Sequence, residues 1–178
     1  MTSVRRLYLD HNATAPLRPE ARSAMISALD MTGNASSPHQ EGRKARGLID
    51  QAREQVAELC QCSEQDVIFT SGATEANAMA LSPYLRLSGR SQDKNHFNRL
   101  LIGASEHPSV LQGHGFSKEF VSDLTILPDG RIDTEGLEIE LKRSLELGQK
   151  PLVSIQAANS ETGVLQEIGQ ISVLVHQY

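Results

Sequence analysis

The feature that most constrains the fold is an order of short β-type run, loop and helix-type run that repeats from residue 66 onward. Runs rich in β-branched, aromatic or other apolar residues lie at 66–70, 99–104, 120–127 and 151–157. Each is followed by a turn or tight loop and then by a segment with helical spacing or a helix start signal. Strands that alternate with helices form mainly parallel sheets covered by helices. The sequence therefore predicts an α/β fold.

Helices are expected between and before these runs. A proline at a first helical position starts a helix at 19 to about 31, and apolar residues at helical spacing extend a second from 40 to 60. Further helices are predicted at 73–87, at 133–148 with Asp133 or Thr134 as N-cap, and at 167–178. The polar stretch 88–98 is predicted to be a surface loop.

Composition excludes several classes of protein. The chain has 178 residues, a length that suits one domain, and 17 Lys and Arg against 22 Asp and Glu give a net charge of −5. Without a basic stripe, a nucleic-acid partner is not expected. No apolar run approaches the roughly 18 residues that cross a bilayer, and the N-terminus lacks the long apolar stretch of a signal peptide. We therefore expect a cytoplasmic protein with no membrane partner.

The two cysteines, Cys60 and Cys62, are too close together to suggest a spaced disulfide framework. A structural zinc site needs four ligands, and no nearby His or Cys supplies them. We expect two reduced cysteines at a helix end and no metal site.

Three loops that follow predicted strands carry residues suited to a ligand. Residues 71–74 join a strand to a helix, where free N–H groups and the helix dipole favour an anion, and Thr74 adds a hydroxyl. His107 offers an imidazole and Asn159 an amide that both donates and accepts. Each has an ordinary structural explanation as helix cap, isolated histidine or turn residue. Because ligands bind beyond the carboxyl ends of the strands in open α/β sheets, the three together favour a phosphorylated aromatic cofactor.

Six ordered motifs resemble the N-terminal part of cysteine desulfurases, which are pyridoxal 5′-phosphate (PLP) enzymes of the class V aminotransferase group. The motifs are YLDHNATAP (8–16), GNASSPHQEGR (33–43), VIFTSGATEAN (67–77), SEHPSVL (105–111), ILPDGRID (126–133) and SIQAANSETGVLQ (154–166). The resemblance implies the N-terminal part of the large domain of a fold-type I PLP-dependent transferase. Under that interpretation, residues 1–15 form an N-terminal segment and residues 16–178 form an incomplete cofactor-binding domain.

The resemblance also implies roles for individual residues. Ala73 and Thr74 match residues that hold the cofactor phosphate, His107 matches the catalytic histidine that stacks on the pyridine ring and assists proton transfer, and Asn159 matches an asparagine near the ring hydroxyl. A segment near the substrate entrance is matched by His11, Asn12 and Thr14. A loop close to the dimer contact is matched by Asn34, Ser36, Ser37 and His39, with Ala35 in place of the usual proline.

A complete enzyme of this kind converts L-cysteine to L-alanine and passes the sulfur to an enzyme cysteine as a persulfide, for iron–sulfur cluster or thio-cofactor assembly. In the family, the Schiff-base lysine and the sulfur-accepting cysteine come after the region matched here. None of the five lysines lies in the family's Ser-x-His-Lys motif. We therefore expect a truncated chain that is inactive alone and that pairs with a copy of itself, as a homodimer, or with a complementing C-terminal half. A sulfur-acceptor protein is a further expected partner.

Two other interpretations stay open from the sequence. One is another class V PLP enzyme, a selenocysteine lyase or an aminotransferase, with the same cofactor loops. The other is a non-catalytic remnant or interaction module that keeps the fold without the chemistry.

Overall fold

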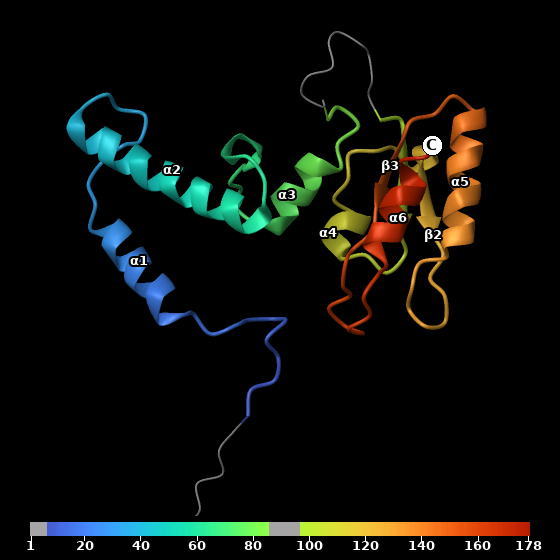
Figure 1. Ribbon diagram of the computed structural model, residues 1–178, viewed down its shortest axis with the longest axis horizontal. Helices are drawn as coiled ribbons and strands as arrows, with labels where there is room; N and C mark the ends of the chain where they lie inside the picture. The colour runs from blue at the N-terminus through green and yellow to red at the C-terminus, as the bar shows by residue number, and fades with distance from the viewer. Residues whose placement is uncertain (1–6, 86–96) are drawn as a thin grey trace, which may run out of the picture. The chain divides into compact units, whose positions relative to one another are not determined.

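The structure is a computed structural model that describes residues 7–85 and 97–178, drawn as a ribbon in Figure 1. The chain divides into two compact units, Met1–Phe69 and Thr70–Tyr178, and each is described by itself. Most of the predicted surface loop 88–98 lies outside the described residues. Within the described ranges, no helix is both long and apolar enough to cross a membrane.

The first unit contains the helices α1 (Pro19–Leu29) and α2 (Gln40–Cys60) and a short 3-10 helix at Glu64–Asp66. The prediction of α2 is confirmed at both ends, and α1 begins as predicted and ends two residues early. The His39 side chain caps α2 by accepting a hydrogen bond from the Gly42 N–H. At the other end, Gln61 takes a left-handed conformation with φ of 54°, and its N–H bonds the carbonyls of Ala57 and Glu58. Local capping chemistry therefore sets the ends of this helix.

The apolar stripe of α2 is exposed. Leu48 and Ile49 are about 40% exposed and Leu59 is 82% exposed. Cys60 lies at the end of the helix, as expected from the sequence, and both Cys60 and the nearby Cys62 are free and exposed.

The predicted strand at 66–70 is wrong. Residues 67–70 form no strand, and Ile68 and Phe69 are 70% and 50% exposed. The Arg53 guanidinium lies 5.6 Å from the centre of the Phe69 ring, a cation–π distance. A β-branched run becomes a strand only when a neighbour satisfies its backbone N–H and C=O groups. The structure gives this segment no such neighbour among the described residues.

The second unit is built on a parallel sheet of three strands, β1 (Arg99–Gly103), β2 (Val121–Leu124) and β3 (Pro151–Ser154). Their spatial order is β2-β1-β3, with Leu100 opposite Val121 on one side and Leu152 on the other. These strands confirm the predicted α/β class. They are shorter than the predicted runs because the outer residues turn into loops.

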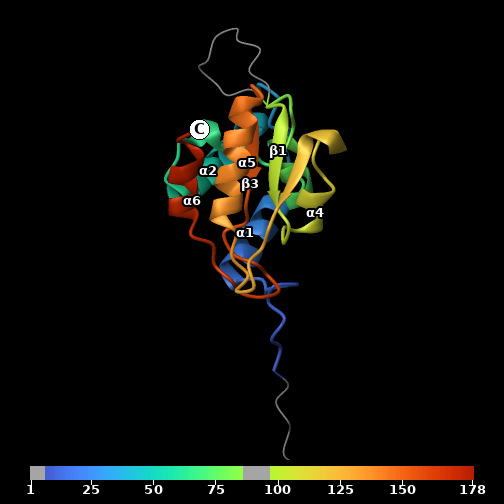
Figure 2. The same ribbon diagram turned by 90° about the vertical axis from the view of Figure 1, so that its right-hand side faces the viewer.

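Helices cover both faces of this sheet. On one face, α5 (Thr134–Glu146) and α6 (Ile168–Val175) pack their leucines and isoleucines against Leu101 and Leu124. On the other, α4 (Pro108–Leu111) and Leu81, the residue that follows α3 (Ala73–Ala80), pack against Leu100 and Ile102. In Figure 2, α5 and α4 lie on opposite sides of β1. Alternate residues of β1 therefore belong to two separate cores.

Two helices differ from their predicted ends for local reasons. The prediction for α3 extends to residue 87, but the helix stops at Ala80, three residues before Pro83. A proline removes an N–H and disfavours helical geometry in the residue before it, so the chain turns here. In α5, the choice between two caps is settled, since the Asp133 carboxylate accepts from the Gly136 N–H at 3.1 Å.

A hairpin-like loop at 126–132 is held by one buried glutamine. Ile126 and Ile132 form an antiparallel bridge, and Gly130 in the turn has φ of +85°. The Gln166 side chain accepts from the Ile132 N–H at 2.9 Å and donates to the Gly130 carbonyl at 3.0 Å. Gln166 is 8% exposed, so it joins two sequence motifs through the interior.

Candidate functional site

The strand order makes the carboxyl ends of β1 and β3 the place where this fold is expected to bind a ligand. The chain leaves β1 for β2 on one side of the sheet and then crosses to β3 on the other. In open α/β sheets, such a reversal opens a crevice between the diverging loops. The loop after β1 carries His107, and the loop after β3 carries Asn159.

These two loops are joined by hydrogen bonds from amide side chains. Gln156 donates from Nε2 to the Ser105 carbonyl at 2.6 Å and to the Ser105 hydroxyl at 2.9 Å. Asn159 donates from Nδ2 to the same carbonyl at 3.2 Å. Its Oδ1 accepts from the N–H groups of Glu161 and Thr162, both at 2.9 Å. Asn159 therefore shapes its own loop and keeps the second N–H of its amide for another acceptor.

A buried carboxyl group, that of Glu106, connects the His107 loop to β3. Glu106 is 9% exposed, and its Oε1 accepts from the Ser154 hydroxyl at 3.3 Å. Burial raises the pKa of the Glu106 carboxyl, although hydrogen bonds from Ser154 and from the backbone of His107 and Gln156 oppose that effect. The residue before His107 is thus fixed to β3 and its extension.

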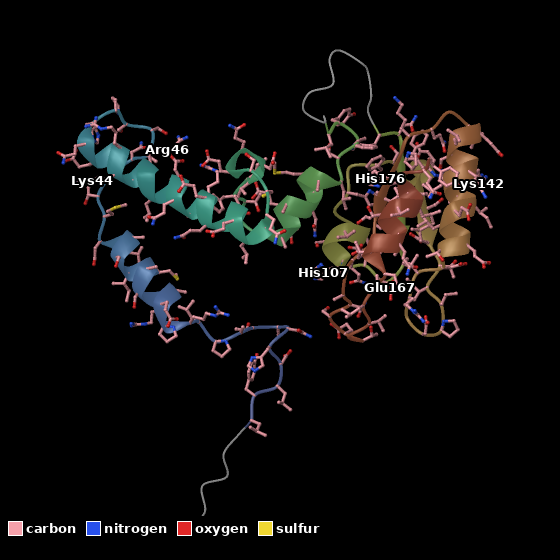
Figure 3. All side chains as sticks on the ribbon, in the orientation of Figure 1. Lys44, Arg46, His107, Lys142, Glu167 and His176 are labelled. Carbon is pink, nitrogen blue, oxygen red and sulfur yellow. The ribbon has the colours of Figure 1, made fainter. Side chains whose placement is uncertain are left out.

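A second set of contacts joins the His107 loop to α3. His107 is the N-cap of α4, and its Nδ1 lies 3.1 Å from the Ser109 N and 2.8 Å from the Ser109 Oγ. The Asn77 Nδ2 donates to that hydroxyl at 2.8 Å. Figure 3 labels His107 at the start of α4. Because Asn77 and Thr74 are three residues apart on one helix, they share a face of α3.

The beginning of α3 has the donor groups that an anion needs. Its N-cap is Gly72, which has no side chain to accept the first N–H groups. The Glu75 carboxylate accepts from the Ser71 N–H at 2.6 Å, and this bond lowers the pKa of Glu75. A carboxylate thus already binds a backbone donor here. The exposed Thr74 adds a hydroxyl to the same turn.

The donor set fits a phosphorylated pyridine. Backbone N–H groups and the hydroxyl of Thr74 suit a phosphate, the exposed imidazole of His107 suits an aromatic ring, and the remaining N–H of Asn159 suits a ring hydroxyl. The structure gives contacts between the His107 and Asn159 loops, and between the His107 loop and α3. The hollow beside α3, in contrast, is lined by other residues, namely Glu75, Ala78, Met79, Ser82, Tyr84 and Leu85.

The other residues singled out from the sequence lie in the first unit. Around His11, Asn12 and Thr14, the Tyr8 and His11 rings meet edge to face at 5.2 Å, and the Asp10 carbonyl accepts from the Thr14 N–H. Their predicted position near the substrate entrance stays a prediction.

The predicted dimer loop is a compact turn packed against its own helix. The Asn34 Oδ1 accepts from the Ser36 N–H at 2.9 Å. A Cβ on Gly42 would clash with the Ser37 carbonyl oxygen and lie 2.8 Å from that of Asn34, so only glycine lets the turn approach α2. Its role at a dimer contact is a prediction.

Four residues of the site were missed by sequence reasoning: Asn77, Ser109, Glu106 and Gln156. All four lie inside the six motifs, and only this clustering could have marked them. Their hydrogen-bond partners are 32 to 51 residues away in the sequence, so local patterns do not reveal them.

Comparison with known proteins gives consistent matches. The family described as Aminotransferase class-V matches residues 7–178. The chain is 35% identical to a putative cysteine desulfurase NifS of Bacillus subtilis, over 96% of this chain and 42% of the relative. It is 32% identical to a human selenocysteine lyase, over 94% of this chain and 41% of the relative.

Among solved structures, a NifS-like protein from Rickettsia africae superposes with a TM-score of 0.78 at 31% identity. That match covers 98% of this chain and 46% of the other. The expected fold, an N-terminal part of a PLP-dependent transferase, is confirmed by this likeness and by the parallel sheet. The chain spans less than half the length of the relatives it matches.

Proposed function

Because the chain belongs to the aminotransferase class-V family, we propose that it forms the cofactor-side part of a PLP enzyme that takes sulfur from L-cysteine. The observation that carries this proposal is the connection of two loops and a helix. Hydrogen bonds connect the loop of Asn159 to the loop of His107, and that loop to α3. The residues that suit a ring hydroxyl, an aromatic ring and a phosphate thus lie on connected elements.

In this proposal, each residue binds one part of the cofactor. The N–H groups at the start of α3 and the Thr74 hydroxyl hold the phosphate, and the His107 ring lies against the pyridine ring. Asn159 donates its remaining N–H to the ring hydroxyl. Bound PLP supplies an electron sink for the substrate.

The remaining chemistry is proposed to come from residues outside this chain's 178. A desulfurase needs a lysine that binds the cofactor aldehyde and a thiolate that accepts the sulfur. Cys60 and Cys62 lie at and just after the end of α2, and neither they nor the five lysines belong to the three loops. A second copy of the chain or a complementing C-terminal half is the proposed partner, with a sulfur-acceptor protein as the final recipient.

Selenocysteine lyase activity is a second candidate, since a relative with that name matches as well as the desulfurases do. Assaying the assembled enzyme with cysteine and with selenocysteine separates the two. Sulfide release from cysteine at a rate comparable with selenide release supports the desulfurase.

Cofactor binding by the 178-residue chain is tested by titration with PLP and with pyridoxal, which lacks the phosphate. PLP is expected to bind weakly and pyridoxal more weakly still, because the phosphate supplies the main contacts. A charge-assisted hydrogen bond contributes about 1.5–3 kcal/mol, so Thr74→Ala should weaken PLP binding about 10- to 100-fold. Thr134→Ala is the matched control, since Thr134 is exposed at the start of α5.

Borohydride reduction in the presence of PLP, followed by mass spectrometry, tests the absence of the cofactor lysine. We expect no lysine to be labelled stoichiometrically. A single fully labelled lysine together with sulfide release from cysteine would overturn the proposal that the cofactor lysine and the sulfur-accepting thiolate come from outside this chain. Equal affinity for PLP and pyridoxal, unchanged in Thr74→Ala, would overturn the proposed phosphate site.

A further inference from the structure

The imidazole of His107 has two hydrogen-bond partners at the same nitrogen. Its Nδ1 lies 3.1 Å from the Ser109 backbone N and 2.8 Å from the Ser109 Oγ. A backbone N–H only donates, so Nδ1 must offer it a lone pair. In the neutral ring the proton is then on Nε2.

The direction of the whole hydrogen-bond chain follows from that one backbone N–H. Since Nδ1 accepts, the Ser109 hydroxyl donates its proton to Nδ1 and keeps its lone pairs for another donor. Asn77 is that donor, with its Nδ2 at 2.8 Å from the hydroxyl. The chain therefore runs from the Asn77 amide through the Ser109 hydroxyl to the imidazole, with every donor pointing toward His107.

We propose that Asn77 and Ser109 are positioning residues that hold His107 in the tautomer with its proton on Nε2. The free nitrogen of the ring is then a hydrogen-bond donor. The group that His107 contacts through Nε2 must accept a hydrogen bond, which selects an anionic or carbonyl oxygen over an ammonium or amide N–H. This selection deepens the proposed function and rests on it, whereas the tautomer is a property of the chain alone.

Two other histidines provide internal comparisons. His176, labelled at the end of α6 in Figure 3, has its Nδ1 2.7 Å from the Ser172 carbonyl oxygen, so that nitrogen must carry the proton. His39 caps α2 as His107 caps α4, with its Nδ1 3.2 Å from the Gly42 N. Its second partner is the Glu41 carboxylate at 3.1 Å, which accepts rather than donates. Only His107 of these three has two donors at Nδ1.

Nuclear magnetic resonance of the full 178-residue chain with ¹⁵N-labelled histidine tests the proposal without cofactor. At about pH 8, above the ordinary histidine pKa of about 6.5, mostly neutral rings are observed, and the two ring nitrogens report separately whether they carry a proton. His107 is expected to show an unprotonated Nδ1 and a protonated Nε2, and His176 the reverse pattern. A protonated Nδ1 on His107 would overturn the proposal whatever the variants do.

Three variants test the positioning pair. Asn77→Asp places an acceptor beside the Ser109 hydroxyl, so the hydroxyl turns toward it and presents a lone pair to Nδ1. The Nδ1-protonated form of His107 should then become populated. Ser109→Ala should populate the Nδ1-protonated form less, because the backbone N–H remains. Ser109→Thr should keep the pattern of the parent chain, because threonine retains the hydroxyl.

His39 and His176 should keep their patterns in all three variants. An unchanged His107 pattern in both Asn77→Asp and Ser109→Ala would refute a positioning role. Failure of the proposed function would instead appear as equal PLP and pyridoxal binding with the tautomer intact, so the two failures are distinguishable.

Discussion

Replacing Gln166 by methionine tests how the interior holds the 126–132 loop. The change keeps the side-chain volume approximately constant but removes the acceptor of the Ile132 N–H and the donor to the Gly130 carbonyl. Ile132 is 4% exposed, so its N–H cannot turn to water, whereas Gly130 is half-buried. An unsatisfied buried group costs about 1–3 kcal/mol and the second group adds a smaller loss, so we expect destabilisation of about 2–4 kcal/mol.

Urea unfolding of the 178-residue chain gives the change in free energy, and amide hydrogen exchange gives its location. The Ile132 amide should exchange about 30-fold faster or more, since about 1.4 kcal/mol corresponds to a factor of ten. Gln170→Met is the control, because Gln170 is exposed on α6. Stability within about 0.5 kcal/mol of the parent chain, with unchanged exchange at Ile132, would refute the reasoning.

Three further perturbations have definite expected outcomes. Burial raises the pKa of Glu106 above its ordinary 4.5, so the folded state binds that proton more tightly and stability falls as pH rises through the folded pKa. The Glu106→Gln variant should not lose stability in this way. The free energy of unfolding of the variant minus that of the parent chain should therefore increase from about pH 4 to about pH 8. Gly130→Ala should cost more than Gly148→Ala in thermal unfolding, because both have positive φ but a Cβ on Gly130 would lie 2.8 Å from the Val164 Cγ2. Adding Val164→Ala should recover the difference. Leu101→Ala should cost about 2–5 kcal/mol in urea unfolding, because Leu101 is fully buried. A cost below about 1 kcal/mol would contradict its place in the core.

Features that depend on neighbouring residues were predictable from the sequence. The extent of α2 follows from apolar residues at helical spacing, and β1 follows from a compact apolar run. The segment at 66–70 has similar strand propensity but no strand, because pairing requires a partner that propensity does not identify. The end of α3 was predicted too late because its apolar spacing continues past Pro83.

The candidate site was predictable as a set of loops and not as a set of contacts. The fold class implied that His107 and Asn159 follow strands at one edge of the sheet. It did not reveal that both loops meet at Ser105, or that Ser109 connects His107 to Asn77. Such contacts depend on where separate loops pack in three dimensions, and a single sequence carries no direct signal of that packing.

The central position of β1 has a consequence for the order in which the molecule assembles during synthesis. β1 is made first of the three strands, yet the strands that flank it begin at Val121 and Pro151. Loop closure costs less entropy for the nearer strand, so β2 is expected to pair before β3. At about 5–20 residues per second, the apolar run of β1 waits on the order of 3–10 s for its second neighbour. During that interval the nascent chain presents an apolar strand with an open edge, which exposes it to aggregation.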